Sequence, residues 1–335
     1  MMETRRGTIL AAAGLMMIGL ASAPPAGAQD RTGWPDVIRI GTASAGGTYA
    51  VYGAGLAGLL QERLQIEADP RNTGGPVQNM LMVHQGELDL GMTTMGPALE
   101  SWEGRNPLMS GVETRDVRAT FPMYQTPFQV VALADSGIAS LDDLAGKRVG
   151  VGPIEGTSAT YWPVFFETLG IEEVRPVFGG ANELATQLRF RVIRAFAFSG
   201  GFPIPAFVEL ERDQPVNMFA LTAEQQAKLV ASFPVSAFEI PANVYASVAA
   251  PQPTVAMWNF GIANKDVPES LVYEVMKVVL DGNAQMVSIH EAARETLAEN
   301  WVHNTFMWFH PGAVRYYRER GIEIPPELLP PEARQ

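Results

Sequence analysis

The stretch of residues 38–64 constrains the fold of this chain more than any other part of the sequence. A short apolar run over residues 37–40 predicts a buried strand, and Gly46 and Gly47 after it allow a tight backbone turn. From Thr48 onward, apolar residues recur at helical spacing. Because a strand, a small polar loop and a helix direct free N–H groups and the positive helix end at one point, this unit is suited to bind an anion.

A second strand–loop–helix unit begins at Val149. Residues 147–152 predict a strand, residues 153–158 predict a glycine-containing loop, and a helix follows. Because a proline deep inside a helix removes a hydrogen bond, Pro163 predicts that this helix begins near Thr160. We expect the two units to form the two halves of one ligand pocket. The alternative for each loop is an ordinary strand-to-helix turn in which Ser or Thr caps the helix.

Strands and helices alternate along the rest of the chain, which predicts an α/β protein with mostly parallel sheets. The 335 residues exceed the usual size of one hydrophobic core, so we expect two similar lobes. The strand–loop–helix pattern occurs once in each half, and the chain returns to the first lobe near Thr254. The expected division is residues 29–130 plus 253–335 for lobe 1 and residues 131–252 for lobe 2.

Two further loops follow predicted strands. Thr94 ends a strand over residues 88–94, and Gly200 and Phe202 lie in the turn after a strand over residues 195–198. In open α/β sheets, ligands bind at the carboxyl ends of strands, so these residues are candidates for the same pocket. The alternatives are helix capping by Thr94 and core packing by Phe202.

Composition excludes several classes of function. The formal net charge is -12 and no block of Lys or Arg offsets it, so nucleic-acid binding is not expected. The chain has no cysteine, which excludes disulfides, thiolate metal sites and cysteine nucleophiles. A local group of N–H donors can still hold an anion in an acidic protein.

The N-terminus has the features of an export signal. Arg5 and Arg6 precede an apolar run over residues 9–20, and residues 26–28 read A-G-A, a pattern typical of signal cleavage. We therefore expect residues 1–28 to be a cleaved signal peptide and the mature protein to lie outside the cytoplasm. The alternative is an uncleaved membrane anchor, and the arginine pair leaves open a general or a twin-arginine export route.

Enzyme signatures are missing from the sequence. There is no H-E-x-x-H motif, and the four histidines are scattered. Ser44 stands in T-A-S-A-G, which lacks the first glycine of a nucleophile elbow. We therefore expect no catalysis, no metal and no cofactor.

Short segments spread over the chain resemble the TAXI family, the substrate-binding proteins of tripartite ATP-independent periplasmic (TRAP) transporters. They occur in the expected order and cover nearly the whole expected mature chain. The segments are G-T-A-S-A-G-G-T-Y from Gly41, N-T-G-G-P-V-Q-N-M from Asn72, G-E-L-D-L-G from Gly86, L-D-D-L-A-G-K-R-V-G-V-G from Leu141, I-P-A-N-V-Y from Ile240, L-V-Y-E-V-M-K from Leu271 and H-P-G-A-V-R-Y-Y from His310.

The resemblance implies a type II periplasmic binding-protein fold, in which two doubly wound lobes are joined by hinge strands. It implies capture of a small organic anion between the lobes, such as the amino acid glutamate or a dicarboxylate. Delivery would be to the membrane subunit of a TRAP transporter, which runs on an ion gradient rather than ATP. By motif position, the expected ligand-binding residues are Ser44, Gly47, Thr48, Tyr49, Asn79 and Thr94 in lobe 1, and Gly156, Thr157, Ser158, Gly200 and Phe202 in lobe 2.

The chain departs from the family pattern in two places. Residues 188–195 read L-R-F-R-V-I-R-A where relatives have a segment like L-K-D-G-x-I-D-A, so Arg191 and Arg194 bring cations toward the following strand. Glu155 stands in the second loop, where it is able either to bind a ligand amine or to repel a second carboxylate. Two other roles for the same fold also stay open, a sensory ligand-binding module and a periplasmic enzyme.

Overall fold

The structure is a computed structural model that describes residues 30–333 of the chain. The expected signal peptide, residues 1–28, lies outside the described residues. Residues 31–333 belong to one compact unit. Its strands are joined in the order β2-β1-β3-β10-β4-β7-β5-β6, with β8 pairing with β4 and β9 pairing with β10.

The first sheet begins with three short parallel strands. β1 pairs in parallel with both β2 and β3, and α1, α2 and α3 each follow one of these strands. Such crossover connections are what parallel strands require. These elements are β1 (Val37–Gly41), α1 (Thr48–Leu64), β2 (Glu67–Arg71), α2 (Pro76–His84), β3 (Leu90–Thr94) and α3 (Met95–Trp102).

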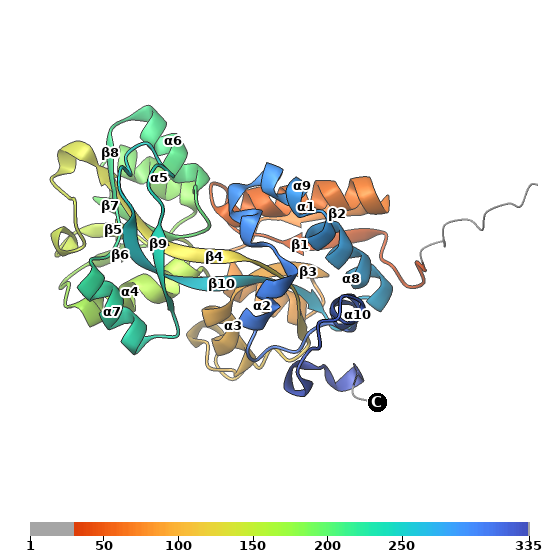
Figure 1. The fold of residues 1–335 in the computed structure, drawn as a ribbon. Helices are drawn as coiled ribbons and strands as arrows, with labels where there is room; N and C mark the ends of the chain where they lie inside the picture. Colours follow the sequence, from red (N-terminus) through yellow and green to blue (C-terminus); the bar gives the residue numbers. More distant parts are fainter. Residues whose placement is uncertain (1–29, 334–335) are drawn as a thin grey trace, which may run out of the picture. The chain divides into compact units, whose positions relative to one another are not determined.

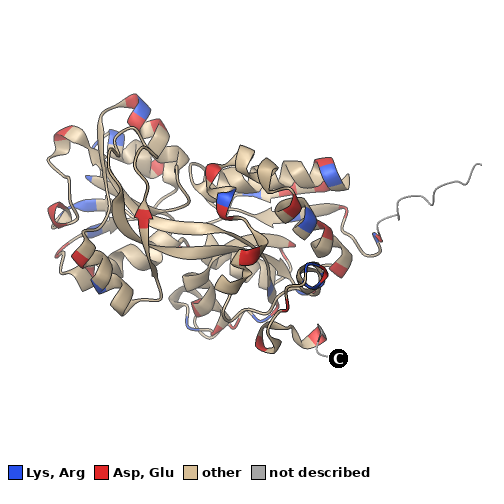
Figure 2. Cartoon of the chain, viewed as in Figure 1, with Lys and Arg blue, Asp and Glu red and all other residues tan. Residues whose placement is uncertain are grey.

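Two long antiparallel strands, β4 (Val117–Leu133) and β10 (Gln252–Asn264), connect the two sheets. The first part of β4 pairs with β10, and its last part, from Phe128 onward, pairs with β7 and β8. Both strands run from one sheet to the other (Figure 1). They are buried along almost their whole length and carry one charged residue, Arg118, in agreement with the tan colour of both strands (Figure 2).

The second sheet is covered on both faces. One face packs against α4 and α7 through Trp162 and Leu229, and the other packs against α5 and α6 through Leu184 and Phe207. A sheet that is apolar on both faces explains why its strands read as continuous apolar runs. The elements are β5 (Arg148–Gly150), α4 (Thr157–Leu169), β6 (Arg175–Val177), α5 (Ala181–Arg189), β7 (Ala195–Ser199), α6 (Pro205–Asp213), β8 (Val216–Phe219), α7 (Ala223–Ser232) and β9 (Ser236–Ile240).

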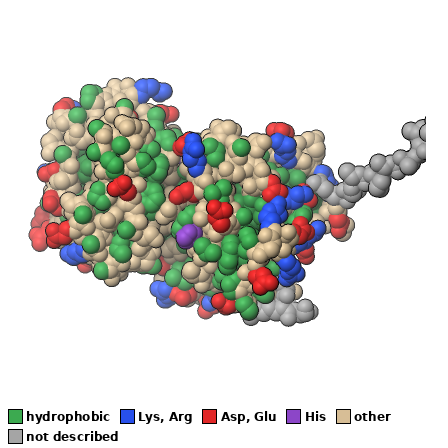
Figure 3. All heavy atoms as spheres, viewed as in Figure 1, with side chains coloured by type: hydrophobic (Ala, Val, Ile, Leu, Met, Phe, Trp, Pro, Cys, Tyr) green, Lys and Arg blue, Asp and Glu red, His purple; other side chains and the backbone are tan. Residues whose placement is uncertain are grey.

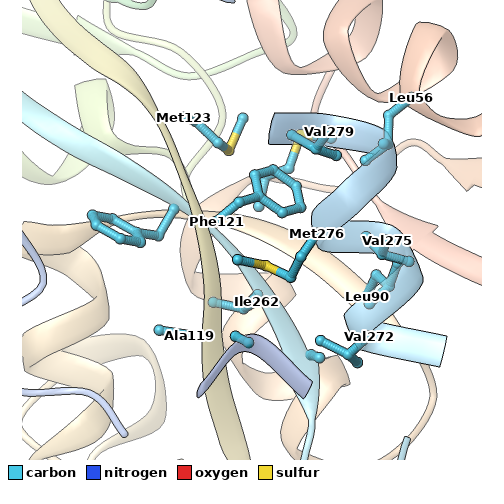
Figure 4. Packing of buried hydrophobic residues seen from close by; sticks show 14 of the residues in the cluster. Leu56, Leu90, Ala119, Phe121, Met123, Ile262, Val272, Val275, Met276 and Val279 are labelled. Atoms are coloured by element: carbon cyan, nitrogen blue, oxygen red, sulfur yellow. The ribbon is translucent and has the colours of Figure 1, made fainter. Parts of the chain in front are cut away.

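After β10 the chain returns to the first sheet. Helices α8 (Glu269–Met276), α9 (Asn283–Ile289) and α10 (Pro311–Glu319) contribute to the core that contains β1, β3 and α1. In Figure 4, Phe121 of β4 and Ile262 of β10 lie close to Met276 at the end of α8. The core on this side is therefore built from segments more than 100 residues apart in the sequence.

The start of α4 corrects one prediction. The helix begins at Thr157, not near Thr160, so Pro163 lies within it. Pro163 cannot donate to the carbonyl of Ala159. Both residues are partly exposed, which lets water reach that carbonyl.

Candidate functional site

A cavity lies where the carboxyl ends of β1, β3, β5 and β7 meet. It measures about 50 Å³, and since one water needs roughly 10–15 Å³ in this measure, it holds about three to five water-sized groups. It is lined by Ala43, Ser44, Gly47, Thr48, Tyr49, Gly74, Gly75, Pro76, Thr94, Thr126, Pro153, Gly156, Thr157, Ser158, Phe198, Ser199 and Gly200.

Four helices begin at this cavity. The residues that precede α1, α2, α3 and α4 all line it, and none of the four makes a side-chain capping hydrogen bond. Their partial positive ends therefore add at one place. These four N-cap residues are Gly47, Gly75, Thr94 and Gly156.

The free donors of these helices come from α1 and α4. Among the described residues, no acceptor takes the backbone N–H groups of Thr48, Tyr49, Thr157 and Ser158. Helix α2 begins with Pro76, which has no N–H, and the next N–H donates to the carbonyl of Glu155 at 3.1 Å. Two pairs of backbone donors, one from each strand–loop–helix unit, are thus available to a ligand.

The cavity wall carries no charged side chain. Its lining contains no Asp, Glu, Lys, Arg or His, and its one ionisable group is the phenol of Tyr49. Burial raises the pKa of Tyr49 far above its usual range, so this hydroxyl stays neutral. The positive potential at the site therefore comes from backbone dipoles alone.

A chain of hydrogen bonds links the two sides of the cavity through Asn259 of β10. The Asn259 amide Nδ2 donates to the carbonyl of Tyr124 at 2.7 Å, which fixes the amide oxygen Oδ1 as an acceptor. Tyr49 and Thr94 both donate to that oxygen, at 2.7 and 2.8 Å. Thr157 in turn donates to Thr94 at 2.8 Å. The hydroxyl protons of these side chains are thus committed to protein acceptors.

The pairing of β4 with β10 explains why the Asn259 side chain is needed as a hydrogen-bond donor. The register between β10 and β4 shifts next to Asn259, because Trp258 faces Gln125 while Phe260 faces Pro122. Such a bulge leaves a residue outside the regular ladder. The carbonyl of Tyr124, within the bulge, is satisfied by the Asn259 side chain.

Other contacts join the two strand–loop–helix units around the cavity. Thr48 donates its hydroxyl to the carbonyl of Gly201 at 2.6 Å. The N–H of Ala181, in the first turn of α5, donates to the Ser44 hydroxyl at 3.2 Å. Gly75 has φ +120°, a conformation that only glycine adopts readily, and a Cβ there would lie 3.4 Å from the Cα of Gly156. The loops of the first sheet are thus in direct contact with the loops of the second sheet.

Nine of the eleven residues expected from sequence line the cavity, and two do not. They come together as Ser44, Gly47, Thr48, Tyr49, Thr94, Gly156, Thr157, Ser158 and Gly200. Asn79 lies behind the wall, where its amide donates to the carbonyls of Thr42 and Met92. Phe202 packs near Phe238, 6.0 Å between ring centroids, and is not in the lining.

Sequence reasoning did not find several residues of the site. Thr126 of β4 and Ser199 of β7 line the cavity. Asn259 accepts hydrogen bonds from the hydroxyls of the lining residues Tyr49 and Thr94. The Ser199 N–H donates to the Ser158 hydroxyl at 2.7 Å. One signal was present, because Asn259 is a polar residue in the otherwise apolar run M-W-N-F-G-I.

The two departures from the family pattern lie outside the cavity wall. Arg189 pairs with Asp213, and Arg191 pairs with Asp135 at 2.6 Å; neither arginine lines the cavity. Glu155 also lies outside the lining, with its carboxylate against Gly74: a Cβ on Gly74 would be 2.3 Å from the Glu155 Oε2. None of these charged side chains is itself a lining residue, although the Glu155 carboxylate lies against Gly74 of the wall.

Residues 30–333 contain no cluster of His, Cys, Asp and Glu suited to hold a metal ion. Within the same range, no helix has the length and apolar content needed to span a bilayer. On the face seen in Figure 3, Lys and Arg are interspersed with Asp and Glu.

Comparison with known proteins gives a family and a fold. Residues 40–321 match the model of the NMT1-like family. A solved structure described as a periplasmic transporter is 12% identical with a TM-score of 0.51, covering 76% of this chain and 82% of that one. A substrate-binding protein of an ABC uptake transporter from Streptococcus pneumoniae with bound histidine is 17% identical with a TM-score of 0.49, covering 78% and 94%. The predicted α/β periplasmic binding-protein fold is confirmed.

Proposed function

The chain belongs to the NMT1-like family, and from that premise we propose that it is a periplasmic solute-binding protein that captures a small organic anion. One observation carries the proposal: four helix N-termini without side-chain caps meet at a cavity that has no charged side chain. Backbone N–H groups at helix N-termini are a common way of holding carboxylates and phosphates. The role is capture and release, without chemical conversion of the ligand.

The fold supports capture by closure of two lobes. Lobe 1 comprises residues 29–130 and 253–335, and lobe 2 comprises residues 131–252, so that β4 and β10 are the hinge strands. The free donors of α1 belong to lobe 1 and those of α4 to lobe 2. A ligand that accepts hydrogen bonds from both would stabilise the closed state over the open state, and so shift the equilibrium between them.

The partner we propose is the membrane subunit of a TRAP transporter that uses an ion gradient. This rests on the resemblance of the segments from Gly41, Asn72 and His310 to the TAXI family. In that role the chain is exported through a cleaved signal peptide, residues 1–28, and works in the periplasm. Glutamate-like amino acids and dicarboxylates are the ligands that the resemblance implies.

A thermal-shift screen tests the proposed function. Protein freed of any carried-over ligand by unfolding and refolding is heated with amino acids, keto acids, dicarboxylates and short monocarboxylates, with sodium chloride at equal ionic strength as control. Binding at 100 times Kd stabilises the folded state by about 2.7 kcal/mol, a rise in Tm of roughly 5 °C. If no small organic anion raises Tm above the chloride control, the proposed function is wrong.

A further inference from the structure

The cavity offers no counter-charge for a second ionic group. One carboxylate can be held by the four free N–H groups of Thr48, Tyr49, Thr157 and Ser158, since its two oxygens accept about four hydrogen bonds. A second carboxylate would find no cation in the wall. Burying an unpaired charge is strongly unfavourable.

The hydroxyl groups of the wall add few donors. The protons of Thr48, Thr94 and Thr157 go to protein acceptors, as does that of Tyr49. The Ser44 hydroxyl accepts from a backbone N–H, and no acceptor within residues 30–333 takes its own proton. A second anionic group would therefore find hydroxyl donors in the wall but no positive charge.

The cavity wall also lacks an anionic partner for an ammonium group of a ligand. No Asp or Glu lines the cavity. The nearest acidic side chain in this loop, Glu155, packs against Gly74 from outside the wall. The positive ends of four helices also oppose a cation at this point.

The rest of the cavity wall is apolar, and the cavity is small. Ala43, Pro76, Pro153 and Phe198 line the cavity beside the polar groups. A volume of about 50 Å³ holds about three to five water-sized groups. This fits a short acid with a small apolar end better than a five-carbon amino acid or dicarboxylate.

Resting on the proposed function, we infer that the ligand is a short monocarboxylate, such as a 2-oxo or 2-hydroxy acid of two to four carbons, with no ammonium group and no second carboxylate. Its carboxylate accepts from the first turns of α1 and α4, and its oxygen substituent lies near the Ser44 hydroxyl. Its methyl or ethyl end contacts Phe198 and the two prolines. The site thus selects against glutamate and dicarboxylates through the absence of a counter-charge.

Isothermal titration calorimetry on the refolded protein tests this inference. The probes are pyruvate, L-lactate, L-alanine, L-glutamate, succinate and lactamide. The expected result is that pyruvate or L-lactate binds at least tenfold more tightly than alanine, glutamate and succinate. Lactamide, which has the shape of lactate without its charge, is expected to bind at least tenfold more weakly than lactate.

The outcomes separate the two proposals. Tighter binding of glutamate or succinate than of either short acid overturns the inference and leaves the proposed function standing. Equal binding of lactamide and lactate contradicts an anion site. Binding by none of the six probes, nor by any anion of the thermal-shift panel, refutes both.

A variant of Glu155 gives a second test. Glu155→Gln removes the carboxylate beside Gly74 and leaves every lining residue unchanged, so the order of affinities should not change. The contrary result has two parts: the unaltered protein binds an amino acid more tightly than lactate, and Glu155→Gln abolishes that binding. Glu155 would then be the partner of the ligand ammonium group, and the inference would be wrong. Circular dichroism confirms that the variant is folded.

Discussion

Asn259→Ala is expected to weaken ligand binding at least tenfold and to lower the free energy of unfolding by about 3 kcal/mol or more. The side chain is fully buried and holds the hydroxyls of Tyr49 and Thr94 and the carbonyl of Tyr124. Alanine leaves the buried Tyr124 carbonyl without its partner and removes the shared acceptor of the Tyr49 and Thr94 hydroxyls, and each hydrogen bond lost in this way costs about 1–3 kcal/mol. Affinity falls because Tyr49 and Thr94 line the cavity.

Asn264→Ala is the matched control. Asn264 lies on the same strand, is 8% exposed, and donates to the carbonyl of Val83 at 2.6 Å, far from the cavity lining. It should destabilise the protein while the ligand Kd stays within about twofold of the unaltered value. Equal loss of affinity in both variants, measured by calorimetry at a temperature where both are folded, would show that Asn259 acts only through stability.

His310→Asn is expected to flatten the dependence of stability on pH. His310 is 1% exposed, and burial lowers its pKa to about 4 from the ordinary value of 6.5. A group whose folded pKa is depressed contributes stability above its unfolded pKa and loses it as pH falls toward the folded pKa. Between about pH 7.5 and about pH 5 this residue alone should remove roughly 2 kcal/mol from the free energy of unfolding.

Asparagine is the informative replacement because it preserves the helix cap. The His310 Nδ1 accepts from the Gly312 N–H at 3.2 Å at the start of α10, and an asparagine oxygen can do the same. Urea unfolding of both proteins at the two pH values gives the comparison. A loss of stability toward pH 5 that is the same in both proteins contradicts a buried neutral His310.

The two strand–loop–helix units at the cavity were predictable because they depend on local sequence. Glycines before an apolar run at helical spacing, as at Gly47 and Gly156, predict a turn and a helix start without any knowledge of the rest. The carboxyl ends of parallel strands then bring such loops together. This is why nine of the eleven expected residues share one cavity.

The role of Asn259, which sequence analysis missed, depends on the register between β4 and β10. Strand β4 begins at Val117, but Arg118, Pro122 and Gln125 interrupt its apolar pattern, so that a continuous apolar run starts only at Phe128. The bulge that frees the Tyr124 carbonyl, and so requires Asn259, follows from how β4 pairs with β10. No property of either strand alone specifies that pairing.

Asn79 shows the opposite error. Its place in a family motif suggested ligand contact, but its amide ties the end of β1 to β3 by donating to the carbonyls of Thr42 and Met92. A motif position does not distinguish a residue that touches a ligand from one that shapes the wall behind it. Geometry distinguishes them, because every polar atom of the Asn79 amide already has a partner within the lobe.

In the binding mode that we propose, backbone N–H groups at the starts of α1 and α4 hold the ligand. The most direct test is a titration with pyruvate or L-lactate followed by amide NMR spectra. The account predicts that the amide protons of Thr48, Tyr49, Thr157 and Ser158 move downfield together, with the same apparent Kd as calorimetry gives. Heat of binding without movement of these four signals, or shifts gathered on another surface, would contradict it.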